Sequence, residues 1–124
     1  MPFKPPNARA KQATANAAQY EDRRGSAQSR GYDAAWRRAA AQHRKRSPLC
    51  RYCQVGAFGS PIIRQAGLVD HLYPHRGDQT LFWDRRWWVS SCTPCHSGPK
   101  QAAEARGKQA IDDLASKLGL HIKG

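Results

Sequence analysis

Four cysteines stand in two pairs, and the chain contains no others. Cys50 and Cys53 form the first Cys-x-x-Cys turn, and Cys92 and Cys95 form the second. Each turn can direct two thiolates at one ion, so together they complete a tetrahedral zinc site with no open position. The segment 54–91 between them leaves room for an inserted hairpin. We expect a structural zinc ion whose binding energy contributes to folding. Two disulfides or an iron–sulfur centre are the alternatives.

The length and net charge of the chain limit the number of domains and the kinds of partner that we expect. The chain has 124 residues and a formal net charge of +12. This length supports one domain with a small core, which often needs a metal or disulfide for stability. The positive field attracts polyanions, and nucleic acid is the expected partner ahead of an acidic membrane surface. A basic protein that is merely soluble is the alternative.

The sequence contains no membrane or secretion signal of the usual kind. No apolar stretch reaches the roughly 18 residues of a membrane helix, and the N-terminus lacks the apolar core of a secretory signal. We therefore expect a cytoplasmic protein of a bacterium or a phage-infected cell, with no membrane partner. Thiols stay reduced in that compartment, where paired cysteines more often hold metal than form disulfides.

Composition divides the chain into a tail and a domain. Residues 1–30 are rich in proline, alanine, glutamine and arginine, and predict a flexible basic tail that either grips phosphates or has no role. The domain is expected over residues 31–120. It begins with a predicted helix over 31–46, in which Trp36 is a core residue and His43 a surface residue.

The remaining pattern alternates short apolar runs with turns, and predicts an α+β domain. The run Trp87-Trp88-Val89 is expected to form a strand that pairs with an earlier one. The final helix is expected to end at Gly119. The other expected features are a strand over 68–72, a short strand over 61–63, a first turn of the last helix at Pro99 and a weakened helix at Gly107.

A second group of chemically active residues lies between and beside the cysteine pairs. It comprises Val69-Asp70-His71-Leu72-Tyr73-Pro74-His75-Arg76-Gly77-Asp78, then Leu81-Phe82-Trp83-Asp84, and His96 directly after the second pair. In order and spacing, these residues and the cysteines resemble the HNH endonucleases of bacteriophages and bacteria, over about residues 32–100. The resemblance implies a small α+β fold with a ββα-metal core. An antiparallel hairpin and a helix would surround one catalytic ion, stapled by the four-cysteine zinc site and flanked by helices.

The resemblance also implies roles for three residues. His71 would be the general base that takes a proton from the attacking water, and Asp70 and His96 would bind a catalytic Mg²⁺, Mn²⁺, Ni²⁺ or Zn²⁺ ion. An unperturbed imidazole pKa near 6.5 suits a base at neutral pH. A divalent ion with few protein ligands keeps positions open for phosphate oxygens. Products would carry 5′-phosphate and 3′-hydroxyl groups.

Local geometry tests this assignment. Adjacent helical side chains diverge by roughly 100°, so Cys95 can serve zinc while His96 serves the second ion. Asp70 and His71 would point to opposite faces of a regular strand, so the strand must end or bulge there. As alternatives, His71 is a buried histidine bonded to backbone with Asp70 as its partner, and His96 is a zinc ligand or a surface residue.

Three further residues are candidates for DNA contacts. His75 either contacts phosphate or holds the turn after the first strand. Arg76 and Arg85 are either phosphate clamps or exposed charges.

The chain departs from the family at the asparagine that gives the family its name. It has no asparagine after Asn16, and Trp87 occupies the corresponding position. In the family, that asparagine commonly holds the loop of the base histidine through backbone hydrogen bonds. Ser90, Ser91 or an indole nitrogen of Trp87 or Trp88 can replace it, or the tryptophans are core aromatics around the zinc.

Two functions are consistent with this sequence. The first is a metal-dependent DNA endonuclease that makes single- or double-strand cuts, works as a monomer or weak dimer, and is linked to phage DNA processing or packaging proteins. The second is a zinc-stabilised nucleic-acid-binding module that is weakly active or inactive. Both predict salt-sensitive DNA binding.

Overall fold

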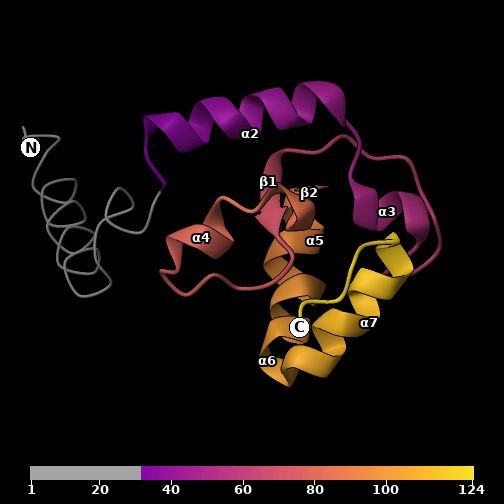
Figure 1. The fold of residues 1–124 in the computed structure, drawn as a ribbon. Coiled ribbons are helices and arrows are strands. Elements are labelled where there is room, and N and C mark those ends of the chain that lie inside the picture. The colour runs from indigo at the N-terminus through magenta and orange to yellow at the C-terminus, as the bar shows by residue number, and fades with distance from the viewer. Residues whose placement is uncertain (1–31) are drawn as a thin grey trace, which may run out of the picture. The chain divides into compact units, whose positions relative to one another are not determined.

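The computed structural model describes residues 32–124, so the tail expected over residues 1–30 lies outside the described part of the chain. Ala34–Gly124 form one compact unit. This unit is a small α+β fold with a two-stranded antiparallel sheet and several helices (Figure 1). The expected fold class is confirmed at this level.

The sheet consists of β1 (Leu68–His71) and β2 (Trp88–Ser91). Their antiparallel register places Asp70 opposite Val89 and His71 opposite Trp88. Both strands agree with the sequence-based expectation to within two residues. All four residues of β2 are buried, because helices cover both faces of this small sheet.

Helices account for most of the remaining fold. In Figure 1, α2 runs along one side of the hairpin, and α6 and α7 lie on the opposite side. Within residues 32–124, no helix combines the length and the apolar character required to cross a bilayer. The helical elements are α2 (Ala34–Arg46), α3 (Arg51–Val55), α4 (Gln79–Phe82), η1 (Arg85–Trp87), α5 (Thr93–Cys95), η2 (His96–Lys100), α6 (Gln101–Arg106) and α7 (Lys108–Leu118).

Helix α2 packs on the hairpin through one apolar stripe. Trp36 and Ala40, four residues apart, are its buried positions, as expected for neighbours on one helical face. The Trp36 ring stacks on His71 at 4.7 Å and meets Trp88 edge-on at 5.0 Å. Trp36 is therefore a core residue, as expected. His43 is half-buried rather than on the open surface, because its ring lies 6.0 Å from that of Trp88.

The start of the last helical segment was predicted wrongly. Helical turns already begin at Thr93, with Pro94 in the first turn, and Pro99 lies inside the π turn η2. Proline cannot donate the i→i−4 hydrogen bond of an α-helix, and the helix is wound as a π turn around Pro99. Gly107 breaks the segment with φ 103 instead of weakening it. Gly119 ends α7 in the left-handed conformation, as expected.

The short strand expected over 61–63 was also wrong. This segment has no regular secondary structure, and Ile63 is 83% exposed. An apolar run forms a strand only when a partner strand lies beside it. Here the nearby pairing is limited to the isolated bridge between Leu49 and Gln65.

Gly56 ends α3 next to the first cysteine pair. Its substitution tests the local fold. Its φ is 66, and an added Cβ would lie 2.7 Å from the Gly59 carbonyl oxygen. We expect Gly56→Ala to lower the free energy of unfolding by about 1–3 kcal/mol. Gly59→Ala is the matched control, because its Cβ meets nothing within 4 Å. Denaturant unfolding of the zinc-loaded chain measures both, and equal effects would contradict this account.

Candidate metal centre and catalytic site

The four cysteine sulfurs converge on one point. All four lie within 4.8 Å of one another. Cys53 Sγ is 3.8 Å from Cys92 Sγ and 3.7 Å from Cys95 Sγ. Sulfurs of a disulfide lie about 2.0 Å apart, whereas a tetrahedron with Zn–S bonds of about 2.3 Å places them about 3.8 Å apart. The cysteines are free and buried. The cluster can therefore hold a structural ion such as zinc.

Secondary structure presents these sulfurs at two helix starts. Cys50 is the N-cap of α3, and its sulfur accepts the Cys53 amide hydrogen at 3.4 Å. Cys92 precedes α5, and Cys95 lies at the end of that short helix. The two Cys-x-x-Cys turns thus meet next to the end of β2.

The surroundings favour a thiolate at Cys92. Burial raises its pKa, but hydrogen bonds from Cys95 and from the Arg64 guanidinium outweigh burial and lower the pKa to about 7. Arg64 Nη1 donates to the sulfur at 3.9 Å. A thiolate is the form that binds metal.

Asp70 forms a buried polar centre beside this cluster. The residue is 3% exposed. Its Oδ1 lies 3.1 Å from His96 Nδ1, and its Oδ2 accepts the Tyr52 hydroxyl hydrogen at 2.6 Å. Lys100 Nζ lies 3.1 Å from the same Oδ2. Asp70 and His96, two residues expected at one site, are therefore in direct contact.

These contacts shift the pKa values of both residues. Burial raises the pKa of Asp70, but the hydrogen bond from His96, the Lys100 ammonium and the Tyr52 hydroxyl together hold this pKa below its usual value. The hydrogen bond to Asp70 raises the pKa of His96. Asp70 is consequently a carboxylate at neutral pH, which is the form that binds a cation.

The separation of Asp70 Oδ1 and His96 Nδ1 suits a shared ion. Ligands at about 2.1 Å in adjacent octahedral positions lie about 3.0 Å apart, close to the observed 3.1 Å. Among the described residues, groups of three or more metal-type ligands occur at the cysteine cluster alone. A catalytic ion on this pair would therefore have two protein ligands and leave its other positions to water and substrate.

Lys100 was missed by the sequence analysis. It is fully buried, and its ammonium group donates to the His71 carbonyl at 3.0 Å and to Glu104 Oε1 at 2.6 Å, beside its contact with Asp70. A buried ammonium needs such partners because it has lost its hydration. The spacing of His96, Lys100 and Glu104 by four residues is a sequence signal for one helical face.

Tyr52 was missed as well. It lies between Cys50 and Cys53, and burial together with the Asp70 charge raises the pKa of its hydroxyl. The group therefore stays protonated and acts as a hydrogen-bond donor to the carboxylate. Its position inside the first cysteine turn gave no sequence signal for this role.

Asp70 and His71 both lie in the regular β1–β2 ladder, so the strand does not break or bulge between them as expected, and the two side chains face opposite ways. The His71 ring contacts α2 and α4, whereas Asp70 contacts α3 and η2, as expected for successive strand residues. His71 Nε2 lies 2.9 Å from the Phe82 carbonyl oxygen. Since a carbonyl only accepts, Nε2 carries the hydrogen in this bond and Nδ1 carries the lone pair.

The environment keeps the His71 ring neutral. Burial, with a smaller contribution from His75, lowers its pKa to about 4, although the Phe82 carbonyl and the Asp70 carboxylate act in the opposite direction. A neutral imidazole can accept a proton. A phosphate bound beside the ring would raise this pKa, because negative charge stabilises the imidazolium form.

The two tryptophans near the missing asparagine have different roles. Trp87 Nε1 donates to the His121 carbonyl at 2.9 Å, away from His71. Trp88 Nε1 donates to the Phe82 carbonyl at 2.9 Å, the same oxygen that His71 contacts. Of the replacements considered, the Trp88 indole is therefore the group that holds the backbone next to His71.

The three candidate DNA-contact residues lie around this region. The His75 ring lies 4.9 Å from that of His71, and its Nδ1 accepts the Gly77 amide hydrogen, so it also holds the turn. Arg76 is exposed, with a positive φ of 49. The exposed Arg85 guanidinium lies 5.5 Å from the Trp88 ring centroid.

Comparison with known proteins adds no family assignment. No protein-family model, no curated protein and no solved structure matches the chain. The residues and their geometry therefore carry the functional argument.

Substitutions distinguish the candidate zinc site at the cysteines from the candidate ion site at Asp70 and His96. We expect Cys50→Ser to release zinc and unfold the domain, because one of four thiolates is lost. We expect Asp70→Asn to retain about one zinc ion per chain, because Asp70 is not a zinc ligand. Elemental analysis of the purified chain and its circular dichroism spectrum measure both outcomes. Zinc loss from Asp70→Asn would contradict the separation of the sites.

Proposed function

We propose that this chain is a metal-dependent DNA endonuclease of the HNH type, with the hairpin and the helical segment Thr93–Arg106 as its ββα-metal core. The observation that carries the proposal is the 3.1 Å contact between the Asp70 and His96 side chains. Asp70 directly precedes His71 in the sequence. A buried carboxylate and an imidazole at this separation suit one divalent ion.

We assign the roles from the chemistry of these groups. Asp70 Oδ1 and His96 Nδ1 would hold the ion, which supplies positive charge to the phosphate oxygens and to the leaving oxygen. His71 Nδ1 accepts a proton from the water that attacks phosphorus. The new P–O bond forms as the bond to the 3′-oxygen breaks, and that oxygen takes a proton from solvent. The products carry a 5′-phosphate and a 3′-hydroxyl.

The formal charge of +12 supports DNA as the substrate. His75 lies against His71, and Arg85 covers the ring of Trp88. We propose that these residues and Arg76 contact the DNA backbone near the cleaved bond. A link to phage DNA processing or packaging proteins belongs to the same proposal.

One observation favours a second candidate, an inactive zinc-stabilised binding module. Lys100 Nζ already lies 3.1 Å from Asp70 Oδ2 and is fully buried. This ammonium neutralises the carboxylate without a metal ion. Both candidates bind DNA, and they differ in cleavage.

Plasmid cleavage distinguishes the two candidates. We expect the chain to cut supercoiled plasmid only with an added divalent ion, and His71→Ala to lower the rate by about 10²–10⁴-fold, because general base catalysis is lost. His121→Ala is the matched control, since its side chain is exposed. Gel electrophoresis follows the reaction with Mg²⁺, Mn²⁺, Ni²⁺ and Zn²⁺. DNA binding without cleavage in every ion would support the second candidate.

The role of Trp88 gives a separate prediction. Trp88→Phe keeps an aromatic ring, although a smaller one, and removes the hydrogen bond to the Phe82 carbonyl. We expect kcat to fall roughly tenfold, the equivalent of about 1.4 kcal/mol, with KM unchanged, because His71 is less well positioned. Trp87→Phe, at the family's asparagine position, should leave kcat unchanged, since that indole bonds to His121 instead. A larger fall in kcat for Trp87→Phe would reverse the assignment.

A further inference from the structure

A pocket of about 450 Å³ opens between the end of α2, α3, β2 and the end of α7. It is lined by three consecutive residues of β2, Trp88, Val89 and Ser90. Because successive strand residues point to opposite faces, a pocket that touches all three follows the edge of the strand. Within the described residues, β2 pairs with β1 alone, so this is its outer edge.

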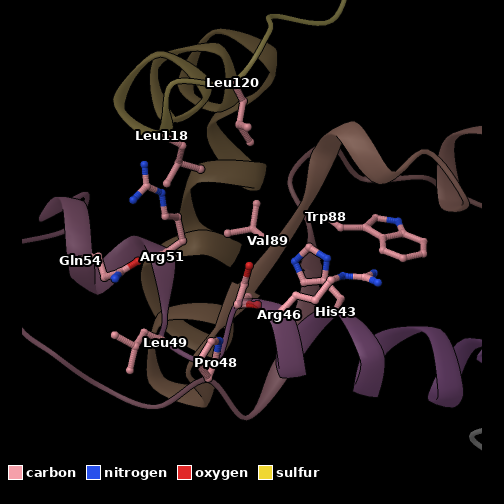
Figure 2. A pocket seen from close by; sticks show the side chains of 12 residues that line it. His43, Arg46, Pro48, Leu49, Arg51, Gln54, Trp88, Val89, Leu118 and Leu120 are labelled. Carbon is pink, nitrogen blue, oxygen red and sulfur yellow. The ribbon is translucent and has the colours of Figure 1, made fainter.

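The pocket is positively charged. Arg46 at the end of α2 lies on one side, and Arg51 at the start of α3 lies on the other. Figure 2 shows Val89 between these two groups. Among residues 32–124, no acidic side chain lines the pocket. The two arginines are exposed, and their charges are available to an anionic occupant.

The centre of the pocket is apolar with polar groups at its edge. Val89, Leu118 and Leu120 contribute the apolar surface, and Leu118 and Leu120 project toward Val89 from the end of α7 (Figure 2). Gln54 lines the rim from α3. Ser90 is buried, and its hydroxyl oxygen has no hydrogen-bond partner in the described part of the chain. That oxygen has almost no accessible surface, so the arginines and the apolar residues, and not this hydroxyl, would contact an occupant.

From these features we infer that the pocket binds one unpaired nucleotide, with the phosphate on Arg46 and Arg51 and the base on the apolar centre. A nucleotide combines an anionic group with a flat, largely apolar ring that carries polar edges, which matches the lining. The volume is typical of a site for one small ligand. A base in an intact duplex is stacked and paired, so it cannot enter such a pocket unless it is unpaired or flipped out.

This inference deepens the proposed nuclease function, because it names DNA with unpaired nucleotides as the preferred substrate. The same chemistry fits a free nucleotide or a nucleotide within a single strand. An acidic peptide along the strand edge would use the arginines but offers no planar base for the apolar centre.

Binding by the full-length, zinc-loaded chain tests the inference without requiring cleavage. The probes are a fluorescein-labelled dT12 single strand and a perfect duplex with the same number of phosphates, without added divalent ion. We expect Arg46→Ala/Arg51→Ala to weaken single-strand binding at least tenfold and duplex binding less than threefold, measured by fluorescence anisotropy.

Arg37→Ala/Arg38→Ala is the matched control. It removes two exposed arginines from α2, lowers the net charge equally and leaves the pocket lining intact. This pair should weaken binding of both probes to a similar, small extent. If the two double variants weaken both probes equally, the pocket does not recognise unpaired nucleotides and the inference is overturned.

Nuclear magnetic resonance separates the two sources of the nucleotide. With dTMP as the probe, shifts of the Gln54, Val89 and Leu120 amide signals show that a free nucleotide enters the pocket. Such shifts with dT12 alone show that the nucleotide must belong to a strand. Either result supports the inference. Shifts confined to other parts of the chain, or shifts at these amides with an oligoglutamate peptide but with neither nucleotide probe, overturn it. Loss of plasmid cleavage with this binding retained would contradict the proposed nuclease alone.

Discussion

The convergence of four sulfurs beside a two-stranded sheet is the constraint on which this small structure depends. The two cysteine turns also place residues other than cysteine beside the sheet. Tyr52 lies inside the first turn and His96 follows the second, and both side chains contact Asp70 on β1. An ion that holds the cysteines would therefore also fix the geometry of the Asp70 centre. The +12 chain has a limited apolar core, so such an ion would supply both folding energy and positional order.

The strand alternation then separates two chemical roles. Asp70 faces the cysteine turns and the helical segment after β2, where its charge is stabilised by three donors. His71 faces α2 and α4, where aromatic rings enclose it and a backbone carbonyl holds one ring nitrogen. One regular strand can thus present an ionised carboxylate and a neutral imidazole at adjacent positions. Lys100 links the two, since it contacts the Asp70 carboxylate and the His71 carbonyl.

The cysteine cluster and the paired strands were predicted from the sequence, because the Cys-x-x-Cys spacing and the short apolar runs are local patterns. Sequence reasoning placed Asp70 with His96 through resemblance to a family. It missed Tyr52 and Lys100, whose roles arise only when the cysteine turns fold against β1. It misplaced the start of the last helix, because the sequence does not distinguish a proline inside a π turn from a proline in the first turn of a helix. The pocket beside β2 could not be predicted from the sequence, because its lining comes from four separate segments.

The proposed function requires one chain to hold two metal ions in different ligand sets, sulfur at the cysteines and oxygen with nitrogen at Asp70 and His96. A crystal of the chain grown with zinc and manganese, measured at the absorption edges of both metals, tests this claim most directly. We expect zinc signal among Cys50, Cys53, Cys92 and Cys95, and manganese signal between Asp70 Oδ1 and His96 Nδ1. Zinc bound by His96 in place of a cysteine, or no manganese at Asp70, would contradict it.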